Sequence, residues 1–231
     1  MAQDYEQMIQ QLLQAAMQYN NSQPVQATAP QCEPVPQQCA AGDAGIPVGI
    51  SNRHIHLSQQ DMDALFGPGY ELTKIKDLKQ PGQFACKETL TVCGPKGALE
   101  KVRVLGPLRK ATQVEVLLGD SFKLGVKPPT RMSGDLGGTP GITLVGPKGS
   151  VQLAEGVIVA QRHIHMTAQE AAQYGVHDGQ IVSMEFDGPR CGILGNVAIR
   201  AGEGHSLECH VDTEEANALA ITSDTTFKLI K

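Results

Sequence analysis

The stretch Arg53-His54-Ile55-His56 returns as Arg162-His163-Ile164-His165, and this repeated motif decides the fold of the chain. Small and β-branched residues precede both copies, which predicts that a strand runs through each motif. Residues two apart on a strand point to the same face, so the two imidazoles of each pair face one way. The repetition therefore predicts two related halves, each carrying one histidine pair.

Two neutral imidazoles that converge on one point are a metal-binding arrangement, and nitrogen ligands suit zinc and other late first-row ions such as cobalt or iron. A single His-x-His on a strand can also be an ordinary pair of polar side chains. The second copy favours metal binding, because both copies keep the motif while the residues around them diverge.

A third ligand for each pair is indicated by an alignment of the two halves. When residues 102–116 are laid over residues 197–211, Glu115 falls on His210. Both residues lie between apolar neighbours, so both project from the same side of an alternating strand. Three protein ligands and an open position are typical of catalytic zinc. The alternative is that Glu115 and His210 are solvent-facing residues without a ligand role. The predicted metal ligands are His54, His56 and Glu115 in one site, and His163, His165 and His210 in the other.

The composition excludes several classes of protein. A chain of 231 residues with 41% hydrophobic content can bury a core in one or two domains, and the repeat favours two. An aromatic content of 4%, the absence of Trp and a net charge of −5 argue against nucleic acid as a partner. We find neither the ~20-residue apolar run of a membrane span nor a secretory signal, and expect a soluble intracellular chain without a membrane partner. The six cysteines form no Cys-x-x-Cys pair, so we expect reduced thiols.

The N-terminal segment differs from the rest of the chain. Apolar residues between Asp4 and Tyr19 recur at three- and four-residue spacing, which predicts an amphipathic helix over residues 1–20. A Pro- and Gln-rich linker follows over residues 21–45. A helix this short needs a partner, so we expect either docking on another protein or packing on its own domain. Its apolar stripe also indicates self-association, and we expect a homo-oligomer, a dimer.

The body is expected to be mainly β with short helices. Ser58 and Thr167 each follow a histidine pair and are placed to cap a short helix. Beyond these helices, short strands separated by Gly-Pro turns favour barrels or sandwiches over a parallel α/β sheet. Arg53 and Arg162 face away from the histidines on alternating strands, so we expect a structural salt bridge for each. We divide the body into a first half, residues 46–150, and a second half, residues 151–231.

Several motifs occur together in this chain: the doubled Arg-His-Ile-His, Gly106-Pro107-Leu108-Arg109, the strand Gln113-Val114-Glu115, Arg131-Met132-Ser133-Gly134-Asp135, and the N-terminal helix with its linker. With these motifs, residues 46–231 resemble the PduL-type phosphotransacylases, the phosphate propanoyltransferases of bacterial microcompartments. The resemblance implies two small β-barrels related by an internal duplication, with strands exchanged between the halves and two metal ions, usually zinc, at their junction. The family's metal positions coincide with the six predicted ligands.

The resemblance also implies a reaction and a location. The reaction is acyl-CoA plus phosphate in equilibrium with acyl phosphate plus coenzyme A, with propanoyl as the expected acyl group. The location is the lumen of a bacterial microcompartment, where residues 1–20 would bind the shell or other cargo proteins. A binuclear metallohydrolase and a non-catalytic, metal-bound compartment adaptor remain alternatives.

Five further residues are expected in the site. Arg109 is the candidate for phosphate, because a guanidinium forms two parallel hydrogen bonds to an oxyanion. Ser133 would add a donor beside it. For coenzyme A, the resemblance suggests Lys76, Arg103 and Asn217.

Overall fold

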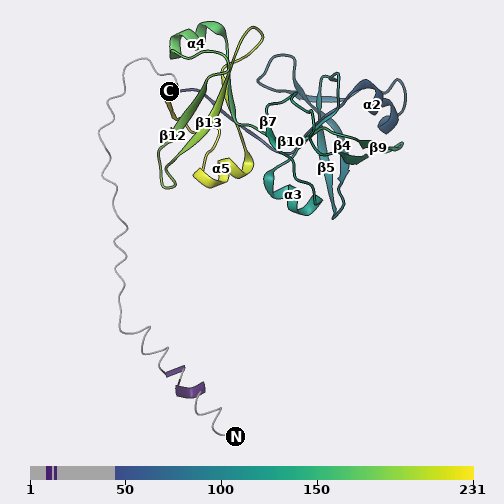
Figure 1. The fold of residues 1–231 in the computed structure, drawn as a ribbon, viewed down its shortest axis with the longest axis horizontal. Helices are drawn as coiled ribbons and strands as arrows, with labels where there is room; N and C mark the ends of the chain where they lie inside the picture. The colour runs from purple at the N-terminus through teal and green to yellow at the C-terminus, as the bar shows by residue number, and fades with distance from the viewer. Residues whose placement is uncertain (1–8, 12, 15–44) are drawn as a thin grey trace. The chain divides into compact units, whose positions relative to one another are not determined.

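Strands dominate the described part of the chain and form two curled sheets (Figure 1). The structure, a computed structural model, describes residues 9–11, 13–14 and 45–231. The six-stranded sheet has the order β1 (Val48–Ser51), β14 (Glu208–Asp212), β11 (His163–Met166), β13 (Gly192–Ala201), β12 (Ile181–Phe186) and β15 (Lys228–Ile230). The nine-stranded sheet has the order β7 (Thr130–Arg131), β10 (Val157–Ala160), β6 (Gln113–Glu115), β2 (His54–His56), β5 (Ala98–Gly106), β4 (Phe84–Cys93), β8 (Ile142–Val145) and β9 (Ser150–Leu153), with β3 (Lys74–Asp77) paired to β4.

Short helices flank both sheets, which confirms a mainly β fold with short helices. Figure 1 shows α2 and α3 beside the nine-stranded sheet, and α4 and α5 beside the six-stranded sheet. The predicted starts of two helices are confirmed, because the side chains of Ser58 and Thr167 accept hydrogen bonds from the first turns of α2 and α4. The helices are α2 (Gln59–Phe66), α3 (Leu118–Leu124), α4 (Ala168–Tyr174) and α5 (Thr213–Leu219).

Each sheet contains one strand from the other half of the body as divided above: β1 belongs to residues 46–150 and β10 to residues 151–231. Strand β1 pairs in parallel with β14, placing Gly49 opposite His210. Strand β10 pairs in parallel with β6, placing Ile158 opposite Glu115. Val48 accordingly packs in the core of the six-stranded sheet, whereas Val157 packs in the core of the nine-stranded sheet. No single cut within residues 45–231 separates the two sheets, and the domain bounds expected from the sequence stay a prediction.

Two hairpins turn at the Gly-Pro-Lys-Gly sequences, as expected from their Gly-Pro content. In the β4–β5 hairpin the amide of Gly94 donates to the carbonyl of Gly97 at 2.9 Å, and the amide of Gly146 makes the equivalent 2.9 Å bond to Gly149 in the β8–β9 hairpin. A Cβ added at Gly94 would lie 2.2 Å from the carbonyl oxygen of Leu124, so this turn requires glycine.

Only a small part of the N-terminal helix prediction falls on described residues. Residues 9–11 and 13–14 are helical, and the side chains of Ile9 and Leu13 are 52% and 55% exposed. The rest of the predicted helix and the predicted linker lie outside the described residues, except for residue 45. Within the described part of the chain, every helix is too short or too polar to cross a membrane. The cysteines described, at positions 86, 93, 191 and 209, are free thiols.

Two equivalent salt bridges tie the histidine motifs to the helices that follow β6 and β14. Arg53 Nε lies 2.6 Å from Asp120 Oδ2, and Arg162 Nε lies 2.6 Å from Glu215 Oε1. Both carboxylates belong to the first turn of their helix, where a negative charge also interacts favourably with the helix dipole. The predicted structural role of the two arginines is thus confirmed.

Replacement of Arg162 by Met is expected to lower the free energy of unfolding by about 1–3 kcal/mol, because the partly buried Glu215 loses its cation. The carbonyl of Gly195 also loses the 2.6 Å hydrogen bond that Arg162 Nη1 donates. Urea unfolding measures the difference. Arg190→Met, at an exposed position, is the matched control. Equal midpoints for the two variants would contradict a stabilising ion pair.

Candidate metal centre and active site

The first cluster of side chains lies on β2 and β6. His54 is directly opposite Glu115 in the antiparallel pairing, and His54 Nε2 lies 3.4 Å from Glu115 Oε2. One ligand atom from each of His54, His56 and Glu115 lies within 4.8 Å of the others. His54 Nδ1 is 2.7 Å from the carbonyl oxygen of Asn52, which can only accept a hydrogen bond. His54 therefore carries its proton on Nδ1 and presents the Nε2 lone pair to the cluster.

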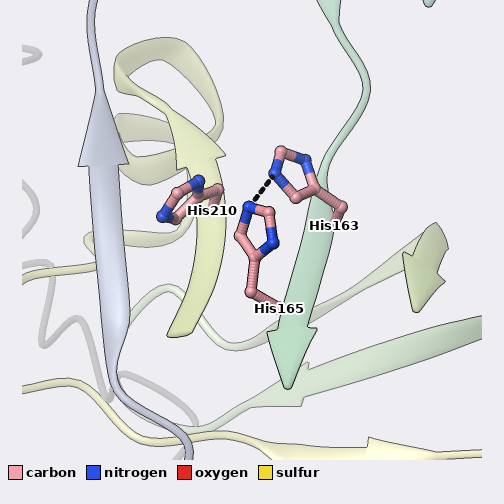
Figure 2. A group of neighbouring side chains, drawn as sticks. All are labelled: His163, His165 and His210. Carbon is pink, nitrogen blue, oxygen red and sulfur yellow. Dashed lines mark hydrogen bonds between the residues drawn. The ribbon is translucent and has the colours of Figure 1, made fainter. Parts of the chain in front are cut away.

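The second cluster lies on β11 and β14, and its three rings converge in Figure 2. His163 is directly opposite His210, the same relation that His54 has to Glu115. His163 Nε2 lies 3.0 Å from His165 Nε2, while His163 Nδ1 lies 2.7 Å from the carbonyl oxygen of Gln161. The structure thus places His210 and Glu115 in equivalent positions, in agreement with the alignment of the two halves.

Three of the histidines are held in the neutral form, whereas the pKa of His54 shifts the other way: burial would lower it, but the neighbouring Glu115 carboxylate outweighs burial and raises it. Burial lowers the pKa of His56 to about 3, with a contribution from His54. Burial also lowers the pKa of His163 to about 4 and that of His165 to about 2, with neighbouring histidines adding to both shifts. These rings are neutral near pH 7, which is the form that binds a metal. Burial favours the neutral form of Glu115, but His54 outweighs it and lowers the carboxyl pKa well below its ordinary range.

The residues present fit a divalent cation at each cluster. Each cluster offers three nitrogen or oxygen ligands on rigid strands, the ligand types that zinc and related ions accept. The Nδ1 atom of His56 is buried and has no hydrogen-bond partner among the described residues. A buried polar atom without a partner is costly, and a bound ion would give this atom a partner.

Both clusters line one cavity of about 540 Å³, which is within the size range of small-molecule sites. Its lining carries an excess of positive charge, so the cavity suits an anionic ligand. Besides the ion-paired Arg53 and Arg162, its basic residues are Lys79, Lys101, Arg103, Arg109 and Arg200.

The predicted catalytic residues lie next to each other beside the first cluster. Arg109 Nη1 donates to Ser133 Oγ at 2.8 Å, and Gln113 Nε2 donates to the same oxygen at 2.8 Å. Ser133 Oγ lies 3.3 Å from Glu115 Oε1. The backbone amide of Gly134 donates to Gln113 Oε1 at 2.7 Å, which holds this loop against β6. The arrangement fixes a guanidinium and a hydroxyl at the wall of the cavity.

Of the three residues suggested for coenzyme A, only Arg103 lies at the cavity that both clusters line. Arg103 lines the cavity, and its Nη1 donates to the carbonyl of Cys86 at 2.6 Å. Lys76 on β3 and Asn217 on α5 are exposed and are not among the residues that line this cavity. All three roles stay predictions.

Sequence reasoning missed other residues of the site. Lys79, Lys101 and Arg200 line the cavity, yet each is an isolated basic residue without a motif around it. His205 was part of the aligned segment without an assigned role, and its Nδ1 lies 3.0 Å from His165 Nδ1. Glu208 was also in that alignment, where it falls on Gln113. The change from a neutral to an acidic side chain at this aligned position was the signal that could have identified it.

Comparisons with known proteins agree with one another. A family model described as phosphate propanoyltransferase matches residues 47–222. A protein of Rhodobacter capsulatus named phosphate propanoyltransferase is 54% identical over 198 residues, which cover 84% of this chain and 92% of that protein. A protein of the same name from Thermotoga maritima is 56% identical over 182 residues, covering 78% of this chain and 87% of that protein.

Proposed function

The chain belongs to the phosphate propanoyltransferase family and is an acyltransferase, and on that premise we propose that it acts on propanoyl-CoA with two metal ions. An oxygen of phosphate forms a bond to the thioester carbonyl carbon, the carbon–sulfur bond breaks, and coenzyme A leaves as the thiolate. The observation that carries the proposal is the single cavity lined by both three-ligand clusters and by Arg109. Acetyl or another short acyl group would fit the same chemistry.

Arg109 and Ser133 are proposed to hold phosphate. The guanidinium offers two parallel donors to two phosphate oxygens, and the Ser133 hydroxyl adds a third donor when its proton turns from Glu115 Oε1, 3.3 Å away, to phosphate. Fixing the anion beside the acyl carbon replaces a random encounter with an oriented one. The remaining basic residues of the cavity favour entry of both anionic substrates.

The two clusters are proposed to hold one metal ion each, with zinc as the expected element and cobalt or iron compatible with the ligands. His54, His56 and Glu115 would hold one ion, and His163, His165 and His210 the other. When bound, the ions supply Lewis acidity and positive charge for a carbonyl oxygen and a leaving thiolate. The protein's part is to hold His56, His163 and His165 neutral, Glu115 ionised and both sets of ligands on neighbouring strands.

We further propose that the two sheets are two small β-barrels related by duplication, with the metal sites at their junction. The equivalent pairings of His54 with Glu115 and of His163 with His210 support this relation. The exchanged strands β1 and β10 occupy equivalent places in the two sheets and support it as well.

The decisive assay for the reaction measures thiol release from propanoyl-CoA with and without phosphate. Release that depends on phosphate, with formation of propanoyl phosphate, is the expected result. Release that is independent of phosphate would support the binuclear metallohydrolase. No release from metal-loaded protein would support the non-catalytic adaptor.

Removal of residues 1–20 is expected to leave turnover unchanged and to abolish recruitment to a bacterial microcompartment. We propose this segment as an encapsulation helix that binds the shell or other cargo proteins, and as a site of homo-oligomer formation. The exposed Ile9 and Leu13 in its helical part support a docking surface. Fluorescence microscopy of tagged full-length and truncated chains in compartment-forming cells measures recruitment. Normal recruitment of the truncated chain would contradict the proposal.

A further inference from the structure

The two clusters differ at one pair of equivalent positions that the predicted ligands do not include. Gln113 lies opposite His56 in the β2–β6 pairing, and Glu208 lies opposite His165 in the β11–β14 pairing. Gln113 is therefore replaced by an acid at the corresponding place in the second half.

The third metal ligand two residues away changes in the opposite sense, from the acid Glu115 in the first cluster to His210 in the second. In the first cluster the ligand is the carboxylate of Glu115, and the neutral Gln113 donates to it at 2.5 Å. In the second cluster the ligand is the imidazole of His210, and its Nε2 donates to Glu208 Oε2 at 2.7 Å. Each cluster consequently contains one carboxylate, placed inside the ligand set in one case and directly behind it in the other.

We propose that Glu208 is a positioning residue of the second metal site, which fixes the orientation and tautomer of His210 and supplies the negative charge that Glu115 supplies in the first site. This inference rests on the proposed binding of two metal ions. A carboxylate only accepts hydrogen bonds, so the shared proton lies on His210 Nε2. The lone pair of the ring is then on Nδ1 and available to a metal.

The surroundings of Glu208 hold its carboxylate in place. Its side chain is buried, and its Oε2 accepts the 2.7 Å hydrogen bond from His210 Nε2. A histidine that donates to a carboxylate is a stronger and better-oriented metal ligand. Among the hydrogen bonds of the three rings in the described residues, Glu208 is the carboxylate that is bonded to a ligand, because His163 bonds to the carbonyl of Gln161 and His165 to His205.

Gln80 holds the carboxylate from the opposite sheet. It lies in the loop between β3 and β4, and its side chain is 4% exposed. Its Nε2 donates to the carbonyl of Ser206 at 2.9 Å and to Glu208 Oε2 at 3.4 Å, while its Oε1 accepts from the amide of Ser206 at 3.2 Å. The second cluster is thus supported by a loop of the nine-stranded sheet.

The test is the release of metal from Glu208→Gln during titration with a chelator. Glutamine keeps the size of the side chain and a hydrogen-bond acceptor but removes the charge. One of the two zinc equivalents is expected to leave at a chelator concentration about 10–100-fold lower than in the unchanged protein, while the other leaves at the same concentration. Glu203→Gln, the same change at an exposed position of the same half, is expected to release both equivalents as the unchanged protein does.

The outcomes separate this inference from the proposed function. An unchanged protein that binds no zinc would overturn the two-metal function itself. An unchanged protein that binds two equivalents, together with Glu208→Gln that releases both normally, would overturn only the role of Glu208. Gln80→Ala leaves the carboxylate in place and is expected to weaken the same equivalent by a smaller factor, about 3–10-fold. If Glu208→Gln does not fold, Gln80→Ala becomes the test of the role of Glu208. Release of both zinc equivalents from Gln80→Ala at the same chelator concentrations as from the unchanged protein would then overturn the inference.

Discussion

His163→Ala is expected to lose one of two bound metal ions per chain and to reduce acyl transfer by about 10³-fold or more. The side chain is buried, and its Nε2 lies 3.0 Å from His165 Nε2, so the substitution removes one of the three grouped ligands. Loss of an ion that contributes several kcal/mol to the transition state corresponds to a rate effect of this size. Elemental analysis and the phosphate-dependent thiol assay measure the two effects.

His177→Ala is the matched control for this prediction. His177 is exposed, its Nδ1 lies 2.9 Å from the carbonyl oxygen of Asp178, and it is not among the residues that line the cavity. It is expected to keep the full metal content and turnover. If His163→Ala retained two metal equivalents and normal turnover, the second cluster would not be a metal site of the enzyme.

Arg109→Lys is expected to reduce phosphate-dependent turnover by about 10²–10³-fold while leaving the metal content intact. Lysine keeps the charge but offers no planar pair of donors, so the oriented hold on phosphate is lost. Ser133 also loses the 2.8 Å hydrogen bond from Arg109 Nη1. Steady-state kinetics with varied phosphate are expected to show a raised KM for phosphate together with a lowered kcat.

Two comparisons make the result for Arg109→Lys interpretable. Arg190→Lys, at an exposed position, is expected to behave like the unchanged enzyme. Metal content measured on the same samples separates loss of phosphate binding from damage to the first cluster. Full activity of Arg109→Lys would remove this residue from the phosphate site.

Much of the candidate site could be predicted because its information is local and duplicated. The His-x-His pattern fixes two imidazoles on one face of a strand, and the structure has both motifs on strands, β2 and β11. Glu115 and His210 could be found because the same strand follows each motif in the same register. Arg53 and Arg162 were assigned to salt bridges by the same alternation, which the structure confirms.

The rest depends on contacts between segments that are distant in the sequence. Lys79, Lys101 and Arg200 line one cavity because the walls of that cavity come from both sheets. No local sequence pattern distinguishes these three from other basic surface residues. Gln113 and Glu208 are aligned with each other, but the sequence does not show why one is neutral and the other acidic. The reason is visible only in the structure, where Gln113 bonds to the carboxylate of Glu115 and Glu208 bonds to the ring of His210.

The central claim is that two metal ions, each held by one three-ligand cluster, share a cavity in which phosphate and a thioester meet. The most direct measurement is a crystal structure of the active protein soaked with coenzyme A and phosphate, with anomalous data collected at the metal absorption edge. We expect one anomalous peak at each cluster, with the sulfur of coenzyme A and the phosphate both inside the cavity and phosphate against Arg109. Active protein with no anomalous peak at either cluster, or with coenzyme A bound outside the cavity, would contradict the account.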